Sequence, residues 1–402
     1  IRSALGNFYP HEWVFRHGPG SVAGQGYGSY KYDFMHWPDR LDSTFPYADF
    51  ACANYAQVGY ESVEAARARG FSHELPAKLC AVPKTIKAPR LIACEPVALQ
   101  WCQQAVRDYF YSRVNATFLA KFVDFRRQDL NGMLALEASH SQSHATIDLS
   151  SASDSISCWH VERLFRRSPM LLRALQATRS VWIEQDICKY SPRFHKLRKY
   201  STMGNATTFP VQSIFFAAIA LGCVITTRGL RVCDETIRSL RKSEVRVFGD
   251  DIIVPKDSSG LLVSMLHALE LKVNVSKTFL TGKFRESCGV DAYDGKDVTA
   301  VSILDMPRRA APSSIASCVD VHNNLHCAGY YNAAAYVRKT ARSLGFGKIR
   351  EIEHGDGAFG WHVLGVPDLS GFRTRVNQAT QVREVRCIGP RPKCSRTPAS
   401  GS

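Results

Sequence analysis

Three kinds of segment are absent from this sequence, and each absence argues against a class of protein. The 13 cysteines are scattered singly from Cys52 to Cys394 with no CxxC pair, a pattern typical of reduced thiols in a cytosol rather than of a disulfide framework or a zinc cage. The longest apolar run, residues 214–225, is too short to span a bilayer, so we expect a buried helix and no membrane partner. The glycine-rich segment 18–30 lacks the GK[ST] ending of a P-loop, and we interpret it as a structural loop.

Two further absences concern metal ligands and the start of the chain. The nearest approach to a metal cluster is His322, His326 and Cys327, where a fourth ligand is missing, so we interpret these residues as part of a structural helix. No signal peptide opens the chain, which begins with Ile rather than Met. We therefore expect an internal piece of a longer protein.

The charge balance is strongly basic. The chain has 51 Lys and Arg residues against 36 Asp and Glu residues, which gives a formal net charge of +15. Such an excess favours a polyanionic partner, most commonly nucleic acid. A hydrophobic content of 45% indicates a folded protein, and 402 residues exceed what one core supports, so two or three subdomains are expected.

A basic segment bounded by prolines lies at residues 82–96. Lys84, Lys87 and Arg90 recur at intervals of three, and Pro83 and Pro89 oppose a helix, which predicts an extended ribbon. Three cations along a ribbon can hold a triphosphate or a template backbone. An ordinary solvated strand edge is the alternative.

From residue 143, apolar and polar residues alternate, which predicts a short strand that ends at Asp148. The polar run SSAS follows. Asp154 is then predicted to cap a helix whose apolar residues are Ile156, Val161, Leu164 and Phe165.

Two adjacent aspartates occur in the segment EVRVFGDDIIVPK, residues 244–256. Two β-branched runs flank a tight polar turn, which predicts a β-hairpin with Asp250 and Asp251 at its tip. A glycine-bearing loop, STMGNATTF, leads into the apolar helix before it. After it, we expect a helix over residues 257–271 and a strand over 273–279 that holds Lys277. This order predicts an α+β fold with a small antiparallel sheet of the split-βαβ kind.

The chemistry of these carboxylates points to divalent cations. Adjacent aspartates repel each other, and a cation such as Mg²⁺ or Mn²⁺ offsets that cost. If the strand that ends at Asp148 lies beside the hairpin, three carboxylates converge, as nucleotidyl transfer by two ions about 3.5–4 Å apart requires. Two aspartates in a turn are by themselves more often only a turn. The prediction of a nucleotidyl-transfer site depends on the order of five features along the chain. They are the basic ribbon, the strand that ends at Asp148, the glycine-bearing loop, the hairpin with the two aspartates, and Lys277.

Five phrases carry a resemblance to a known family. The chain resembles the RNA-directed RNA polymerases, or replicase β subunits, of the levivirus-like positive-strand RNA bacteriophages, from about Gly18 to the early three-hundreds. The phrases are VPKTIKAPRLIACEP (82–96), TIDLSSASDSIS (146–157), STMGNATTF (201–209), VFGDDIIVP (247–255) and KTFLTGKFRESCG (277–289).

The resemblance implies a right-hand polymerase that replicates a phage genome in the cytoplasm of a bacterial host. Residues 1–140 would form N-terminally incomplete fingers, and residues 141–305 would form the palm, with part of 165–200 contributing to the fingers. Residues 306–380 would form the thumb, and residues 381–402 a basic, disordered tail. The implied partners are the RNA template, the nascent strand and nucleoside triphosphates. Host elongation factors Tu and Ts and a ribosomal protein join the replicase in this family.

The resemblance also implies roles for individual residues. Asp148 and Asp250 would be the main ligands of two Mg²⁺ ions, assisted by Asp251, and Lys277 would be a general acid for pyrophosphate. Nucleotide binding would fall to Lys84, Lys87, Arg90, Asp154, Gly204, Asn205, Thr208 and Gln212, and primer or RNA binding to Phe284, Arg285, Glu286 and Ser287. Gln212 is a departure, since many RNA polymerases place an Asn there to read the 2′-hydroxyl.

Two other functions stay open at this point. A reverse transcriptase also carries an aromatic-x-Asp-Asp hairpin, which Phe248 to Asp251 would satisfy, although the STMGN and FRESCG segments argue against it. A basic RNA-binding protein without catalysis would use the carboxylates only structurally, and its activities would not change in Asp250→Asn.

Overall fold

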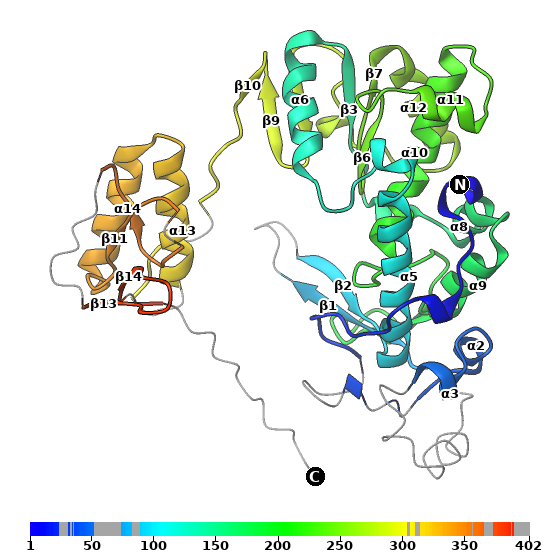
Figure 1. Cartoon of the computed structure of the whole chain (residues 1–402), viewed down its shortest axis with the longest axis horizontal. Coiled ribbons are helices and arrows are strands. Elements are labelled where there is room, and N and C mark those ends of the chain that lie inside the picture. Colours follow the sequence, from blue (N-terminus) through cyan, green and yellow to red (C-terminus); the bar gives the residue numbers. More distant parts are fainter. Residues whose placement is uncertain are drawn as a thin grey trace. The chain divides into compact units, whose positions relative to one another are not determined.

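The computed structural model describes residues 1–23, 31–32, 34, 36–51, 74–82, 89–303, 306–309, 314–355, 357–365, 373–386 and 388–389. The chain divides into two compact units, Ile1–Thr299 and Ala300–Ser402 (Figure 1).

The central sheet of the first unit has three antiparallel strands. They are β3 (His144–Ile147), β7 (Asp251–Pro255) and β6 (Arg246–Phe248), in the order β3-β7-β6. Ile147 pairs with Ile252, and Phe248 pairs with Asp251. The predicted α+β class, the strand before Asp148 and the hairpin are confirmed.

Helices cover both faces of this sheet, which explains the uninterrupted apolar run of β7. Ile252 and Val254 join the main core with α10 (Thr208–Thr227) and α12 (Lys256–Ala268). Ile253 points the other way and packs against Leu134 and Ala135 of α6 (Asp129–Ser141), which lies beside β3 in Figure 1.

The helix α10 is the buried helix that the sequence predicts. It has 20 residues and is apolar enough to span a membrane by length and composition, but 72% of its most apolar window is buried. It packs against β6, β7 and α12. A core helix therefore accounts for its composition.

A second sheet has the order β2-β1-β4-β5. Its strands are β1 (Ala77–Val82), β2 (Arg90–Cys94), β4 (Trp182–Glu184) and β5 (Phe194–Lys196). β1 pairs antiparallel with β2 and parallel with β4, so Ala77 and Lys78 lie beside Ile183 and Glu184, more than a hundred residues later in the chain. The long helix α5 (Val97–Asn115) follows β2 directly.

The other helices in the part of the first unit that the structure describes are short. The structure gives α1 (Arg2–Leu5), η1 (Pro10–Glu12), α2 (Asp39–Asp42), α3 (Tyr47–Phe50), η4 (Phe118–Lys121), α7 (Ala152–Ser155), α8 (Cys158–Phe165), α9 (Pro169–Thr178) and α11 (Asp234–Ser239).

Two local predictions of the first unit are wrong. Ser157, not Asp154, caps the helix α8, because Ser157 and His160 form a reciprocal capping box while Asp154 lies within α7. The expected strand over residues 273–279 has single bridges at Val273 and Phe279 around the 3₁₀ turn η5 (Val275–Lys277), so Lys277 lies on a turn.

A hairpin next to α6 completes the first unit. It consists of β8 (Phe284–Ser287), β9 (Val290–Tyr293) and the short β10 (Lys296–Asp297). Cys288 and Gly289 both have positive φ, 54° and 82°, as the two central residues of a type I′ turn require.

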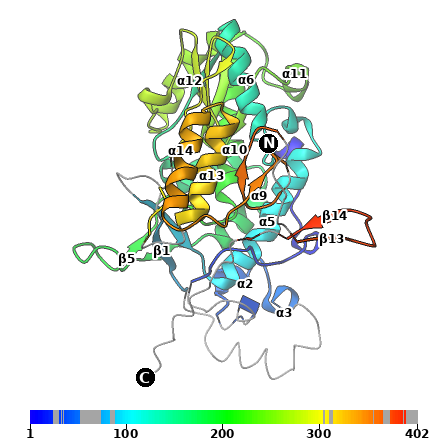
Figure 2. The ribbon, with the colours of Figure 1, turned by 90° about the vertical axis from the view of Figure 1, so that its left-hand side faces the viewer.

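The second unit is built on two helices, α13 (Ser314–Cys327) and α14 (Tyr331–Ser343), which Figure 2 shows side by side. Gly329, with φ of 83°, lies in the turn between these two helices. Two small sheets follow: β11 (Glu351–Ile352) with β12 (Trp361–His362), and β13 (Thr374–Val376) with β14 (Arg383–Val385). The tail expected to be disordered from residue 381 thus begins within a hairpin, and residues 390–402 lie outside the described residues.

Candidate active site

The turn between β6 and β7 presents two aspartates at its tip. Gly249 has φ of +64° and Asp250 does not have a positive φ, which is the pattern of a type II′ turn with glycine first. The Gly249 N–H donates to Ser213 Oγ at 3.0 Å. A Cβ at Gly249 would lie 3.2 Å from the Phe209 ring, so the neighbouring helix also favours glycine there.

Asp148 is brought to this turn by the strand register. Ile147 pairs with Ile252 in the last pair between β3 and β7, so Asp148 follows β3 at the end of the sheet where Asp251 begins β7. The charge of Asp148 acts on Asp251. Asn274 Nδ2 donates to Asp148 Oδ2 at 2.8 Å, and the Asn274 N–H donates to the Asp148 carbonyl at 2.9 Å. The half-buried Asp148 is therefore held at the sheet edge by the turn that precedes Lys277.

Asp251 is anchored to the β8–β9 turn. Its Oδ1 accepts the Cys288 N–H at 3.1 Å, and its Oδ2 accepts the Cys288 thiol at 3.5 Å. Burial raises the pKa of Asp251, the Cys288 N–H lowers it, and the charge of Asp148 raises it further. A cation would offset this cost of keeping Asp251 ionised.

The three carboxylates do not form one tight cluster. Among the described residues of the first unit, no three His, Cys, Asp or Glu side chains have all their ligand atoms within 4.8 Å of one another. Asp148 is hydrogen-bonded to Asn274, and Asp251 is hydrogen-bonded to Cys288. A cation that bound all three aspartates would have to replace some of these bonds.

Lys277 lies close enough to Asp148 and Asp251 to interact with their charges. Its ammonium group pairs with Glu286, which is the largest cause of its raised pKa, and the charges of Asp148 and Asp251 raise it further. Lys277 therefore remains a cation near the carboxylates. The sequence did not identify Glu286 as the partner of this lysine.

The strand β8 divides its residues between two faces. Arg285 is fully buried, and its guanidinium donates to the carbonyls of His144 at 2.6 Å and Gly282 at 2.9 Å. Ser287 is buried as well, beside Asp251. The RNA contacts predicted for Arg285 and Ser287 are thus replaced by structural roles, while Phe284 and Glu286 lie on the partly exposed face.

The Gly204 loop packs tightly on β2. Gly204 has φ of +122°, and a Cβ there would lie 2.0 Å from the Ala93 carbonyl oxygen. Asn205 Oδ1 accepts the Thr207 N–H at 2.8 Å, and the Thr208 hydroxyl donates to the Thr202 carbonyl at 2.8 Å. The buried side chains of Asn205 and Thr208 therefore shape the loop, and their contact with a nucleotide stays a prediction.

Gln212 is buried on α10 near the aspartate turn. Its Nε2 lies 3.9 Å from the position that a Cβ on Gly249 would occupy. The structure thus brings this predicted residue to the hairpin that holds Asp250 and Asp251.

The other predicted nucleotide contacts are on the surface or outside the described residues. Asp154 is exposed and forms an ion pair with Lys199. Arg90 is exposed at the first position of β2. Lys84 and Lys87 lie outside the described residues.

A buried carboxylate near the Gly204 loop was missed. Glu95 is 1% exposed and accepts hydrogen bonds from Ser180 Oγ at 2.6 Å, Gln103 Nε2 at 3.2 Å and Thr202 Oγ1 at 3.3 Å. Burial raises its pKa. Glu95 ties β2, α5 and the loop together, and a single Glu between Cys94 and Pro96 gives no sequence signal of this role.

Asp251→Asn is expected to gain stability relative to the metal-free wild type as pH rises. The folded wild type binds the Asp251 proton more tightly than the unfolded chain, so its free energy of unfolding falls as pH rises from about 4 through the raised pKa. The Asn variant removes this titration and keeps an oxygen for the Cys288 N–H. Denaturant unfolding in a chelator from about pH 4 to 8 measures the difference; parallel curves would contradict it.

Comparison with protein families gives one extended match. The family described as RNA replicase, beta-chain, matches residues 40–325, which include Asp148, Asp250 and Asp251. The RNA-directed RNA polymerase subunit beta of Qbeta virus (strain MX1) is 31% identical over 323 residues, covering 78% of this chain and 49% of that protein. The RNA-directed RNA polymerase beta chain of Enterobacteria phage fr is 29% identical over 311 residues, covering 77% and 52%. The chain thus spans about half the length of these relatives.

Two solved structures align with about two thirds of the chain. The RNA-dependent RNA polymerase of a human picobirnavirus aligns with a TM-score of 0.46 at 12% identity, covering 69% of this chain and 58% of that one. The telomerase of Candida albicans, in complex with a fragment of telomeric RNA, aligns with a TM-score of 0.44 at 10% identity, covering 68% and 55%.

Proposed function

Because the chain belongs to the RNA replicase, beta-chain family, we propose that it carries the catalytic centre of an RNA-dependent RNA polymerase that replicates a positive-strand RNA phage genome. The observation that carries the proposal is the strand register that brings Asp148, which follows β3, to the end of the sheet where Asp251 begins β7, with Asp250 in the adjoining turn. A strand edge with three carboxylates is the arrangement that template-directed nucleotidyl transfer uses.

The donor set at this edge fits hard divalent cations. Asp148, Asp250 and Asp251 offer carboxylate oxygens, which Mg²⁺ and Mn²⁺ prefer, and burial makes ionised Asp251 costly without a cation. Two bound ions would supply a more nucleophilic 3′-hydroxyl and charge neutralisation at the leaving pyrophosphate. Asp148 and Asp250 would hold these ions with help from Asp251.

Lys277 is proposed to deliver a proton to the departing pyrophosphate. Its pairing with Glu286 and the charges of Asp148 and Asp251 keep it protonated until a more anionic group arrives. The flexible ammonium can then exchange Glu286 for a phosphate oxygen.

Nucleotide and RNA contacts are assigned around this centre. Arg90, with Lys84 and Lys87, would receive the triphosphate, and Asp154 and Gln212 would read the ribose. The loop of Gly204, Asn205 and Thr208 would support that pocket. On β8, Phe284 and Glu286 would face the nascent strand. The resemblance adds host elongation factors Tu and Ts, a ribosomal protein and the bacterial cytoplasm as partners and location.

The subdomain assignment follows the right-hand plan. Residues 1–140 would be fingers, 141–305 palm and 306–380 thumb. The pairing of β4 with β1 supports the inclusion of part of 165–200 in the fingers. The contact boundary between Thr299 and Ala300 lies near the proposed junction of palm and thumb.

Primer extension with ribonucleotides and deoxyribonucleotides side by side tests the proposed function. We expect template-directed incorporation of ribonucleotides that depends on Mg²⁺, with deoxyribonucleotides used poorly. Preference for deoxyribonucleotides would identify a reverse transcriptase. RNA binding without any incorporation, in wild type and Asp250→Asn alike, would identify a non-catalytic RNA-binding protein.

A further inference from the structure

We propose that Cys327, His354 and His362 form a Zn²⁺ site in the second unit, separate from the aspartate centre. Cys327 is the last residue of α13, His362 is on β12, and His354 lies in the loop between β11 and β12. Cys327 and His354 fall outside the ordered motifs of the polymerase, and all three ligands lie beyond the residues that match the replicase family.

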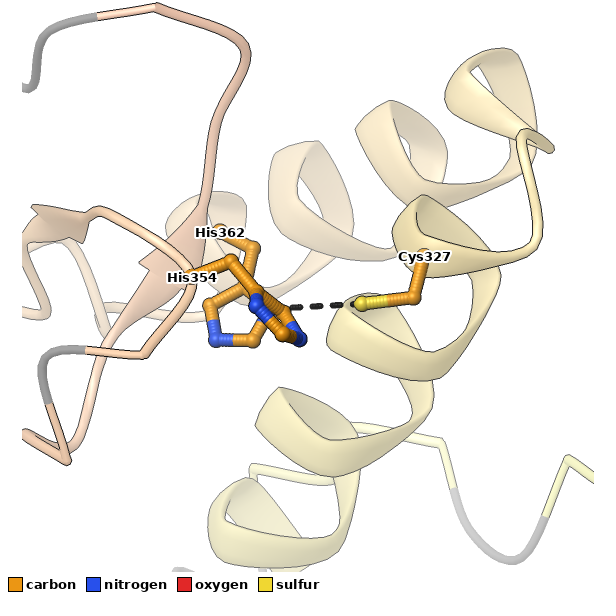
Figure 3. Close-up of side chains that lie close together, drawn as sticks. All are labelled: Cys327, His354 and His362. Atoms are coloured by element: carbon orange, nitrogen blue, oxygen red, sulfur yellow. Dashed lines mark hydrogen bonds between the residues drawn. The ribbon is translucent and has the colours of Figure 1, made fainter.

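The three side chains already stand near zinc-binding geometry. Their ligand atoms all lie within 4.8 Å of one another, and Cys327 Sγ is 3.7 Å from His362 Nδ1. Around a tetrahedral Zn²⁺, a sulfur and a nitrogen ligand are roughly 3.6 Å apart, given bond lengths of about 2.3 and 2.0–2.1 Å. Figure 3 shows the thiol of α13 pointing at the two imidazoles from the opposite segment. Small side-chain adjustments would suffice to bind the ion.

Hydrogen bonds hold the two sides of the cluster in place. Asn323 Nδ2 donates to the Gly360 carbonyl at 2.9 Å, and the His362 N–H donates to Asn323 Oδ1 at 2.9 Å. The ring nitrogens of His322 face the carbonyls of Ala334 at 2.7 Å and His362 at 3.1 Å. These contacts fix the backbone of β12 against α13, so the ligands are positioned before an ion arrives.

The zinc site could not be predicted from the sequence. His322, His326 and Cys327 are neighbours in sequence, but His322 is buried and occupied by carbonyl oxygens, in agreement with its interpretation as structural. The two histidines that join Cys327 follow at a long interval and on different elements. No spacing motif marks them.

The composition of the cluster selects the ion. One thiolate and two imidazoles suit Zn²⁺, whereas Mg²⁺ prefers oxygen ligands. Binding converts the Cys327 thiol to a thiolate and releases its proton to solvent. Cys327 and His354 are exposed, so water can complete the fourth position.

A bound Zn²⁺ ion would stabilise the second unit, whose hydrophobic core is small. Among its described residues, the buried hydrophobic side chains form two small clusters, one that includes Val321 and Val337 and one that includes Val319 and Trp361. The strands β11 and β12 have only two residues each. A Zn²⁺ ion would join α13 to β12 where apolar burial is limited, as in other small units with structural metals.

The test uses the full chain, stripped with a chelator and then supplied with Zn²⁺ or Co²⁺ in the presence of Mg²⁺. We expect one tightly held Zn²⁺ per chain and, with Co²⁺, a thiolate-to-metal charge-transfer band. His354→Asn and His362→Asn should each weaken Zn²⁺ binding at least roughly tenfold. The exposed controls Cys188→Ser and His267→Asn should bind as wild type does.

Two further variants separate the ligand role from folding and from polymerisation. Cys327→His should retain Zn²⁺ and lose the charge-transfer band, which a merely misfolded variant would not do. Asp250→Asn should bind Zn²⁺ normally, whatever its effect on RNA synthesis. Wild type that holds no Zn²⁺ after gel filtration, or Cys327→Ser with unchanged affinity and an unchanged Co²⁺ spectrum, would overturn the proposal.

Discussion

Asp250→Asn is expected to lower RNA synthesis by roughly 10³-fold or more, since cation stabilisation of the transition state supplies several kcal/mol and about 4 kcal/mol corresponds to 10³ in rate. The substitution removes one charge at the tip of the β6–β7 turn and leaves the backbone that Gly249 shapes. Fold and RNA affinity should therefore be retained. Single-nucleotide incorporation under single-turnover conditions measures the chemical step, and a filter-binding assay measures RNA affinity.

The matched control is Asp257→Asn on the neighbouring helix α12. Asp257 is exposed and its Oδ1 accepts the Ser258 hydroxyl, which an Asn can also do. This variant should synthesise RNA at nearly the wild-type rate. Equal activity of Asp250→Asn and wild type would remove Asp250 from the catalytic centre.

Gly204→Ala is expected to lower the free energy of unfolding by on the order of 3 kcal/mol. Two costs combine, because Gly204 has φ of +122° and a Cβ there would lie 2.0 Å from the Ala93 carbonyl oxygen. The clash is with backbone, which cannot rotate away. The loop would separate from β2 and break the hydrogen bond from the Ala93 N–H to the Met203 carbonyl, 2.7 Å long. RNA synthesis should fall with it.

Gly222→Ala provides a control of opposite sign. Gly222 lies within α10, and no heavy atom is within 4 Å of the position of its Cβ. Alanine is a better helix former than glycine by roughly 0.8–1 kcal/mol, so this variant should be slightly more stable than wild type. Urea unfolding of the two variants measures both effects. A Gly204→Ala protein as stable as wild type would show that the loop does not depend on this close approach.

Local patterns predicted the elements that hold the aspartates. The alternation before Asp148 and the β-branched runs around Gly249 report directly on strand geometry, because a half-buried or fully buried strand needs those residues. The predicted site required the strand before Asp148 to lie beside the hairpin. β3 does pair with β7, with Ile147 opposite Ile252.

Two residues form hydrogen bonds that the sequence did not reveal. Asp154 and Ser157 are both good helix caps, and only the local backbone conformation and His160 decide in favour of Ser157. The family resemblance assigned Arg285 to primer or RNA binding, whereas in the structure its side chain is buried and its guanidinium donates to the carbonyls of His144 and Gly282. The first choice is decided locally, whereas the burial of Arg285 depends on His144, which is far away in the sequence.

Some contacts of the candidate sites could not be predicted because no sequence motif marks the side chains that form them. Cys288 meets Asp251 only because the β8–β9 turn lies beside β7, and Glu95 meets Ser180 only through the second sheet. The contacts of Cys327 with His362 are of the same kind. Each of these contacts depends on topology rather than on local propensity.

Binding of Mn²⁺, followed by electron paramagnetic resonance and competed with Mg²⁺, tests the central claim most directly: that Asp148, Asp250 and Asp251 are the divalent-cation site. The wild-type chain should bind Mn²⁺ that Mg²⁺ displaces. Asp148→Asn and Asp250→Asn should each weaken this binding at least roughly tenfold, while Cys327→Ser leaves it unchanged. Mn²⁺ affinity that is the same in wild type, Asp148→Asn and Asp250→Asn would contradict the assignment.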